Sequence, residues 1–325
     1  MSEPEDILRL VEKAPCHQDI SVNQPHQCKA FAPGSIGNLA CGFDVLGLAL
    51  AGPGDEVTAT LVPEPGVRIM EIHGDHGRLS RDVSMNTAGT AALAVLDEVG
   101  ARDGIELQLQ KGLPLAAGMG GSAASAVAGA VAVNFLLGNR LPREVLLRCA
   151  LAGEEVASGG MHPDNAAPSL LGGLVLVPSW EPLRAIELEV PRELFSVHVH
   201  PHLEVETRGA REILGDHVPL ADAVAQWGNT AALVAGLFRG DWDLISSSIE
   251  DRVAEPLRTP AVPGFREVKE AALNAGALGV SLSGSGPSMF ALCRGQERAH
   301  AVAQRMREVF RSAGGLVLVP SWEPL

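Results

Sequence analysis

The chain has 325 residues, and 46% of them are hydrophobic, which is enough to bury one large core or two smaller ones. A net charge of −14 argues against nucleic-acid and anionic-membrane partners. No apolar run reaches the roughly 18 residues of a membrane span, and the acidic start does not resemble a secretory signal. The five cysteines show no paired spacing, so we expect reduced thiols in a cytoplasmic protein.

Residues 1–25 are polar and contain three prolines, so we expect an N-terminal extension with no catalytic part. From residue 26 to 192, strand-like runs alternate with helical ones, and we take this stretch as the first domain. The expected strands are 57–62, 67–72, 105–110 and 174–177. The expected helices are 87–99, 122–137 and 143–157.

Residues 193–325 are taken as the second domain. Alternation at 196–202 predicts a strand, and the other expected strands are 279–282 and 288–293. The expected helices are 220–238, 242–253, 264–275 and 299–312. This mixed order is typical of an α+β protein with two halves.

Three histidines share one face of the strand at 196–202, because alternate positions on a strand point the same way. They are His198, His200 and His202. Pro201 interrupts the strand, and no cysteine or carboxylate cluster completes a zinc site. We therefore expect a partly exposed strand face here rather than a metal centre.

One segment of 12 residues occurs twice, since residues 172–183 recur letter for letter as residues 314–325. Divergent repeats do not stay identical over such a length, and two copies cannot form a solenoid. We interpret the second copy as a recombination or sequence-assembly artefact that replaced the native terminus. Residues 316–319 could still form an edge strand.

The most informative segment is Pro114-Leu-Ala-Ala-Gly-Met-Gly-Gly-Ser-Ala-Ala-Ser125. It precedes an apolar run at 126–137 that predicts a buried helix. Glycine lets backbone N–H groups approach a ligand closely, and a helix N-terminus adds free N–H groups and a positive dipole end. The segment therefore predicts a phosphate-binding loop.

The spacing within this segment distinguishes between the known kinds of phosphate loop. A Walker loop needs a lysine after its second glycine, and none follows Gly121. A dinucleotide fingerprint is formally present from Gly118 to Ala123, but the residues from Lys111 to Ala117 separate it from the preceding strand. Protein-kinase landmarks such as His-Arg-Asp do not occur. The pattern that remains is Pro-x3-Gly-x-Gly-x-Ser-Ala-Ala.

This pattern resembles the second motif of the GHMP kinases, which phosphorylate small molecules such as galactose, homoserine and mevalonate. Further segments are similar to the family in the same order. They are 32–50 with Ser-Ile-Gly-Asn and Gly-Phe-Asp, 154–168 with His-Pro-Asp-Asn, 203–211 with Thr-x-x-x-Arg, 251–258 and 282–288. The His-Pro-Asp-Asn and Thr-x-x-x-Arg patterns resemble homoserine kinases in particular.

The resemblance implies a GHMP kinase architecture. Its N-terminal half would be like ribosomal protein S5 domain 2, its C-terminal half would be ferredoxin-like, and the active site would lie between them. It also implies Mg²⁺-dependent transfer of phosphate from ATP to L-homoserine in threonine biosynthesis. The residues that it places at the nucleotide are Asn86, Lys111, Pro114, Gly118, Met119, Gly120, Gly121, Ser122 and Ala123.

At the metal, the resemblance assigns Ser122 and Glu154, whose hard oxygen atoms suit Mg²⁺. Taken alone, Glu154 would be interpreted as a solvated helix residue, and the motif at 162–165 reverses that interpretation. The chain departs from the family at Gly121, where many relatives have serine. Because Ser122 is retained, we expect activity to survive with the loss of one loop hydrogen bond.

At the acceptor, the resemblance assigns Arg211 and Arg258 to the substrate carboxylate, for which planar paired guanidinium donors are suited. Asp44 matches the residue at the ammonium group. The other acceptor-site residues, near the reacting hydroxyl or shaping the substrate, are Asn38, Asn165 and Thr207. The expected catalytic residues are Asn165, Arg211 and Arg258.

No general base is evident from the sequence. Asp164 could act as one, but orientation of Asn165 is the preferred role, and the hydroxyl would lose its proton late, to the phosphate. Two alternatives stay open: another GHMP kinase, for example for mevalonate or a diphosphocytidyl sugar alcohol, and a nucleotide-binding homologue without catalysis. The expected partner is a small-molecule substrate, and a homodimer is left open.

Overall fold

Six strands of the first half form one sheet. In the computed structural model, which describes residues 26–312 and 321–324, they are β1 (Gln27–Gly37), β2 (Leu46–Val62), β3 (Gly66–His73), β4 (Gly104–Gln110), β5 (Leu174–Trp180) and β6 (Leu183–Leu188). Their order is β3-β4-β2-β5-β6, with β1 on the other side of β2. Only β3 and β4 run parallel to each other. The long strand β2 is therefore the centre of this sheet.

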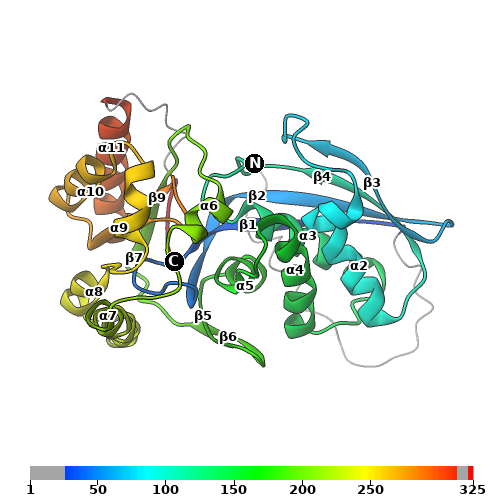
Figure 1. The fold of residues 1–325 in the computed structure, drawn as a ribbon, viewed down its shortest axis with the longest axis horizontal. Coiled ribbons are helices and arrows are strands. Elements are labelled where there is room, and N and C mark those ends of the chain that lie inside the picture. Colours follow the sequence, from blue (N-terminus) through cyan, green and yellow to red (C-terminus); the bar gives the residue numbers. More distant parts are fainter. Residues whose placement is uncertain (1–25, 313–320, 325) are drawn as a thin grey trace.

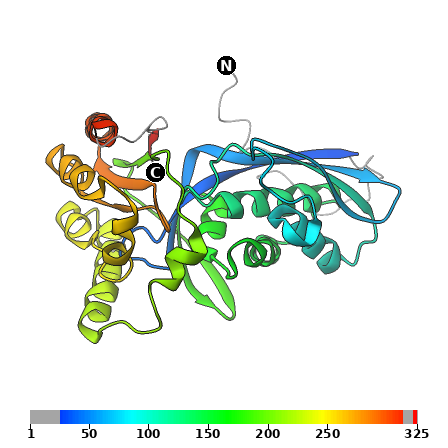
Figure 2. The same ribbon diagram turned by 45° about the horizontal axis from the view of Figure 1, so that its top comes forward.

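Four helices cover one face of the sheet (Figure 2). They are α2 (Thr87–Val99), α3 (Gly121–Leu136), α4 (Arg143–Ser158) and α5 (Pro163–Leu171). Helix α3 is rich in alanine and buried on almost every side, so its neighbours approach closely. A Cβ at Gly129 would lie only 2.9 Å from the carbonyl oxygen of Ala88 in α2. Tight helix packing thus holds the N-terminus of α3, where the predicted phosphate loop ends.

The second half contains a four-stranded antiparallel sheet. Its strands are β7 (Leu194–Val199), β8 (Gly279–Leu282), β9 (Met289–Arg294) and β10 (Ser321–Pro324), in the order β10-β7-β9-β8. Helices α10 (Phe265–Asn274) and α11 (Gln296–Ser312) share a hydrophobic core with it that includes Val268, Met306 and Phe310. The βαββαβ order is that of a ferredoxin-like domain, as the family resemblance predicts.

Four further α-helices and two 3₁₀ helices are present in the described residues, and Figure 1 labels the four α-helices. They are η1 (Val83–Met85), α6 (Thr207–Glu212), α7 (Leu220–Arg239), α8 (Trp242–Ser248), α9 (Glu255–Arg258) and η2 (Thr259–Ala261). Leu233, Leu237 and Ile245, from α7 and α8, belong to the same hydrophobic cluster as the first sheet. The halves therefore share buried surface, and the expected boundary at 192/193 lies in the loop between β6 and β7. In the described part of the chain, no helix is both long and apolar enough to cross a membrane.

Most predicted elements are present in the structure. Helix α2 and strand β8 have the predicted bounds. The predicted helix 242–253 ends at Ser248 instead. The carboxylate of Asp251 accepts the backbone N–H groups of residues 253–255, as a capping residue does, so a new turn begins there. Strand β1 and helix α5 are missing from the prediction because prolines interrupt both segments.

The duplicated segment occupies two different environments. In the first copy, residues 174–180 form β5, between β2 and β6. In the second copy, residues 321–324 form β10, which pairs antiparallel with β7. The proposed edge strand at 316–319 and the extension at 1–25 lie outside the described residues, and the interpretation of the second copy as an artefact stays a hypothesis.

The histidines of β7 are less exposed than the sequence predicts. His198, in β7, and His200, just after its last residue, are only 3% and 6% exposed, and Nδ1 of His200 lies 3.0 Å from the hydroxyl oxygen of Ser288. Burial lowers the pKa of His198 to about 3 and that of His200 to about 4, so both rings are neutral. The expectation of a partly exposed face is wrong for these two residues. Among residues 26–312 and 321–324, no group of three or more His, Cys, Asp or Glu side chains could hold a metal ion.

Two helical glycines give a matched test of this packing. A Cβ at Gly153 in α4 would lie 2.3 Å from the carbonyl oxygen of Thr87, whereas a Cβ at Gly228 in α7 would meet nothing within 4 Å. We expect Gly153→Ala to lower the free energy of unfolding by about 1–3 kcal/mol through overpacking. We expect Gly228→Ala to raise it by up to about 1 kcal/mol through helix propensity. Urea unfolding measures both, and equal stability of Gly153→Ala and the wild type would contradict the close approach of α4 to α2.

Candidate active site

A cleft between the two halves collects the side chains that the sequence assigns to the site. Its volume is about 630 Å³. The predicted site residues that line it are Asn38, Asp44, Asn86, Lys111, Pro114, Gly118, Met119, Gly120, Gly121, Ser122, Glu154, Asn165, Thr207, Arg211 and Arg258. Ala123 does not line the cleft, because it is fully buried inside α3. Residues more than 200 positions apart in the sequence thus face one space.

The glycine-rich loop leads directly into the cleft. Gly118 and Gly120 have φ angles of +71° and +63°, a region in which L side chains are strained. A Cβ at Gly120 would also lie 2.1 Å from Oγ of Ser35. Helix α3 begins at Gly121 without a side-chain cap, which leaves the N–H groups of its first turn available to a ligand.

The third glycine-rich motif, at 282–288, holds this loop from the second half. The hydroxyl of Ser283 donates to the carbonyl oxygen of Gly118 at 2.6 Å, and that of Ser288 donates to the carbonyl of Ala117 at 2.6 Å. A Cβ at Gly118 would lie 2.5 Å from the carbonyl oxygen of Ser283. The loop therefore contacts the second half backbone to backbone.

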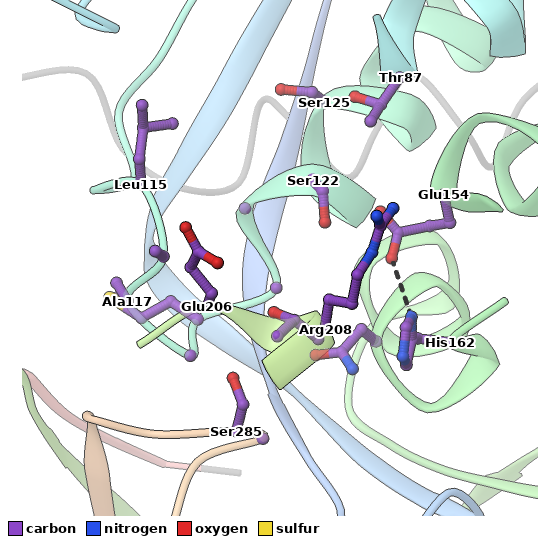
Figure 3. Close-up of a pocket in the computed structure, with 18 of the residues that line it drawn as sticks. Thr87, Leu115, Ala117, Ser122, Ser125, Glu154, His162, Glu206, Arg208 and Ser285 are labelled. Atoms are coloured by element: carbon purple, nitrogen blue, oxygen red, sulfur yellow. Dashed lines mark ion pairs between the residues drawn. The ribbon is translucent and has the colours of Figure 1, made fainter. Parts of the chain in front are cut away.

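Two oxygen-bearing side chains point into the cleft from neighbouring helices, Ser122 from α3 and Glu154 from α4 (Figure 3). Glu154 is 2% exposed. Burial raises the pKa of its carboxyl to about 7, while a hydrogen bond with Ser122 and the charge of Lys111 act in the opposite direction. Nδ1 of His162 lies 3.8 Å from Oε2 of Glu154. A buried carboxylate with a hydroxyl beside it is a donor set that suits a hard cation.

Charged groups of both signs meet at the other end of the cleft. Arg211 and Asp44 form a two-point ion pair, with Nη1–Oδ1 and Nη2–Oδ2 distances of 2.8 and 2.6 Å. Arg258 is 5% exposed and donates to the carbonyl oxygen of Gly284 at 3.0 Å. The ring of Phe43 lies 5.2 Å from the Arg211 guanidinium and 5.5 Å from that of Arg258. One aromatic ring thus supports both cations.

Polar side chains connect the two ends of the cleft. The side-chain carbonyl of Asn38 accepts the backbone N–H of Asp44 at 3.0 Å, which supports the positive φ of Asp44. Oδ2 of Asp164 accepts the backbone N–H of Asn38 at 3.1 Å, and Ser35 donates to Oδ1 of Asn165 at 3.0 Å. Oδ1 of Asp164 has no hydrogen-bond partner in the described structure. Burial, and secondly the charge of Asp44, raises the pKa of Asp164 to about 7.

Comparison with known proteins identifies the family. Residues 86–173 match the GHMP kinases N terminal domain, and residues 233–312 match the GHMP kinases C terminal domain. The chain is 47% identical over 300 residues to a homoserine kinase of Chloroherpeton thalassium, covering 89% of this chain and 94% of that protein. This chain belongs to the homoserine kinase family. A homoserine kinase of Chlorobium phaeobacteroides is also 47% identical, over 292 residues, covering 87% of this chain and 91% of that protein.

A solved structure agrees with this assignment. The homoserine kinase of Cytophaga hutchinsonii superposes with a TM-score of 0.91 at 46% identity, covering 95% of this chain and 98% of that one. The L. major mevalonate kinase is similar in fold alone, with a TM-score of 0.70 at 17% identity, covering 94% of this chain and 99% of that one. The predicted α+β GHMP kinase architecture and the family resemblance are confirmed.

Two residues that the family resemblance places at the nucleotide already have partners in the protein. Asn86 caps helix α2, because its side-chain oxygen accepts the N–H groups of Ala88 and Gly89 at 3.1 and 3.2 Å. Lys111 is buried beside Asp55. Both line the cleft, so their contact with a nucleotide stays a prediction.

The departure from the family at Gly121 lies at a position with room for a side chain. This residue has no positive φ, and a Cβ there would meet its nearest neighbour, Cβ of Leu113, at 3.4 Å. That distance is an ordinary van der Waals contact, so a side chain fits. The loop geometry therefore accommodates both the glycine of this chain and the serine of many relatives at position 121.

Sequence reasoning missed several residues that line the cleft. Arg208 and Ser285 lie on its walls (Figure 3). Arg78 crosses from the first half to Glu204, with Nη1–Oε1 and Nη2–Oε2 distances of 2.5 and 2.8 Å. Ser285 is inside the third glycine-rich motif and could have been included on that ground. The pairing of Arg78 with Glu204 has no signal in the sequence, because 126 positions separate the two residues.

The raised pKa of Asp164 gives a pH dependence of stability. Between the ordinary pKa of 3.8 and the folded-state value of about 7, the folded protein binds a proton at this carboxyl that the unfolded chain does not bind. This group therefore lowers the free energy of unfolding as pH rises through that range. We expect Asp164→Asn to gain stability relative to the wild type between about pH 5 and about pH 8. Urea unfolding at both values tests this, with the exposed Asp97→Asn as control. An equal difference at both values would contradict it.

Proposed function

We propose that this protein transfers the γ-phosphoryl group of ATP to the hydroxyl of L-homoserine, giving O-phospho-L-homoserine for threonine biosynthesis. The observation that carries the proposal is one cleft with an anion-binding loop at one end and an Asp44, Arg211 and Arg258 cluster at the other. The loop suits phosphate, and a cluster of both signs suits the zwitterionic head of an amino acid.

At the nucleotide end, backbone N–H groups of the loop and of the first turn of α3 would bind the β- and γ-phosphates. The positive end of the α3 dipole adds to this attraction. Gly118 and Gly120 expose their backbone, because positive φ angles and crowded surroundings exclude a side chain at both positions. The glycines of the loop therefore act through their backbone, and Ser122 adds a side-chain oxygen.

Ser122 and Glu154 would hold Mg²⁺, with phosphate and water supplying the remaining oxygen ligands that this ion prefers. When bound, the ion neutralises phosphate charge and orients the transferred group. The buried Glu154 fits this role, because an adjacent cation would favour the ionised carboxylate that burial disfavours.

At the acceptor end, the charged groups of the substrate would replace the ion pair between Asp44 and Arg211. Its ammonium group would bind Asp44, and its carboxylate would bind Arg211 and Arg258. Asn38 and Asn165 would orient the hydroxyl, and Thr207, at the start of α6, would shape the substrate. Phosphoryl transfer has a loose transition state, so positioning supplies most of the catalysis, and the hydroxyl proton passes late to the transferred phosphate.

The cellular setting follows from the same chemistry. Cys28, Cys41, Cys149 and Cys293, the cysteines within the described residues, are all free thiols. Free thiols are typical of the reducing cytoplasm, where we place this biosynthetic enzyme. The absence of nucleic-acid partners stays a prediction, and a homodimer stays open.

The acceptor site can be tested by coupled ADP release with Mg-ATP and L-homoserine, L-serine, L-threonine or mevalonate. We expect turnover with L-homoserine, and a KM for it at least about tenfold higher in Asp44→Asn and Arg211→Met, because each loses a charged partner. The KM for ATP should stay close to that of the wild type, as should both constants in the exposed control Arg305→Met. Turnover with mevalonate but not with L-homoserine would indicate another GHMP kinase. ATP binding without any turnover would indicate a non-catalytic homologue.

The loop can be tested by a matched pair of glycine substitutions. Gly120→Ala places a methyl group against Ser35 at a positive φ, so we expect kcat/KM for ATP to fall by about a hundredfold through displacement of the loop. Gly121→Ser has room for its side chain, and we expect kcat/KM within about threefold of the wild type. Steady-state kinetics measures both values. Equal activity of the two variants would rule out the loop as the phosphate site.

A further inference from the structure

A buried ion pair lies directly beneath the phosphate loop. It joins Asp55, in the central strand β2, to Lys111, the residue that follows β4. Their side chains are 1% and 3% exposed. Buried charges are stable only with close partners, so a pair at this depth has to be fully hydrogen-bonded.

The ammonium group of Lys111 has three N–H donors, and the protein supplies three acceptors for them. They are a carboxylate oxygen of Asp55, the carbonyl oxygen of Gly121 at 2.9 Å and the hydroxyl oxygen of Ser125 at 2.9 Å. All three donors are used within the protein. A direct bond from Lys111 to phosphate would require breaking one of these contacts.

The carboxylate of Asp55 is equally well satisfied, and its partners lie at the start of the loop. Oδ1 accepts the backbone N–H groups of Gly112 and Leu113 at 3.0 and 3.1 Å. Oδ2 accepts Lys111 and the hydroxyl of Ser125 at 2.7 Å. Asp55 therefore holds the backbone before Pro114, while Lys111 holds it at Gly121.

The contact with Gly121 also holds the peptide that carries the next N–H group. A trans peptide is planar, so its C=O and N–H bonds point in opposite directions. Gly121 is the first residue of α3, so its carbonyl points along the helix, and Lys111 donates to it from the buried pair. The N–H of Ser122, in the same peptide, points the opposite way. Ser122 lines the cleft. One buried contact therefore fixes the position of a peptide whose N–H is a donor in the first turn of α3, where the phosphate would bind.

We infer that Asp55, Lys111 and Ser125 are positioning residues that tie both ends of the phosphate loop to the sheet beneath it. Lys111 acts on the nucleotide through the backbone of Gly121 and Ser122, not as a phosphate ligand. The inference rests on the proposed nucleotide site, and it assigns a role to Asp55, a residue outside every motif of the sequence.

A double-mutant cycle tests the inference. The variants are Asp55→Asn, Lys111→Met, their double mutant and Ser125→Ala. The control is Lys29→Met with Glu56→Gln, an ion pair on β1 and β2 whose side chains are 59% and 36% exposed. The measurements are the Kd of Mg-ADP by calorimetry, the KM values for ATP and L-homoserine, and the melting temperature.

We expect both single variants to weaken Mg-ADP binding by at least about tenfold, because each breaks the same charged hydrogen-bond network. The double mutant should bind Mg-ADP no more weakly than the weaker-binding single variant, because either substitution alone already breaks the network. Ser125→Ala leaves the ion pair in place and should weaken binding about threefold. The KM for L-homoserine should stay within about twofold of the wild type, and the control should bind as the wild type does.

Three results would overturn the inference. Loss of binding in Lys111→Met together with full affinity in Asp55→Asn would make Lys111 a direct phosphate ligand. Parallel losses for both substrates with a lower melting temperature would indicate a purely structural pair. If Asp55→Asn and Lys111→Met fail to fold, unchanged Mg-ADP affinity in Ser125→Ala would overturn the inference. A wild-type protein that binds no Mg-ADP would instead refute the proposed function, and this inference with it.

Discussion

The close contact of two backbones, the phosphate loop and the turn at 283–286, is the constraint on which the cleft depends. Gly118 has no Cβ, and a Cβ there would lie only 2.5 Å from two carbonyl oxygens of the second half. Serine hydroxyls of the third motif then donate to the carbonyls of the loop. Because the loop is fixed between the halves, its N–H groups and the acceptor cluster face the same space.

Burial controls the charges of this cleft. Glu154 and Asp164 are both 2% exposed, and burial raises the pKa of each to about 7. Both carboxyls are thus disfavoured as anions until a cation or a hydrogen-bond donor arrives. Asp44 and Arg211 instead satisfy each other in the protein alone. A substrate with an ammonium and a carboxylate group can replace both partners at once, whereas a substrate with one charge leaves the other side chain without a partner.

Much of the fold and of the candidate site could be predicted from local sequence. Helix α2 has its predicted bounds because a capping residue, Asn86, and a left-handed glycine, Gly100, mark its ends. The motifs predicted a set of residues that, apart from Ala123, line one cleft. The exposure of His198 and His200 could not be predicted, because a strand pattern does not show which distant segments will pack against its faces. The ion pair between Asp55 and Lys111 was hidden for the same reason, since 56 positions separate its partners.

The duplicated segment separates what the sequence determines from what the tertiary structure decides. Local sequence determined that residues 174–180 form a strand, that glycines shape the loop and that carboxylates and guanidiniums occur at family positions. Yet the same letters pair Trp180 with Leu183 in the first sheet and Trp322 with Val197 in the second. Only the tertiary structure decided these partners, and likewise that Lys111 lies with Asp55 beneath the loop. The physical reason is that backbone hydrogen bonding and burial act between segments distant in sequence, whereas propensity acts within one.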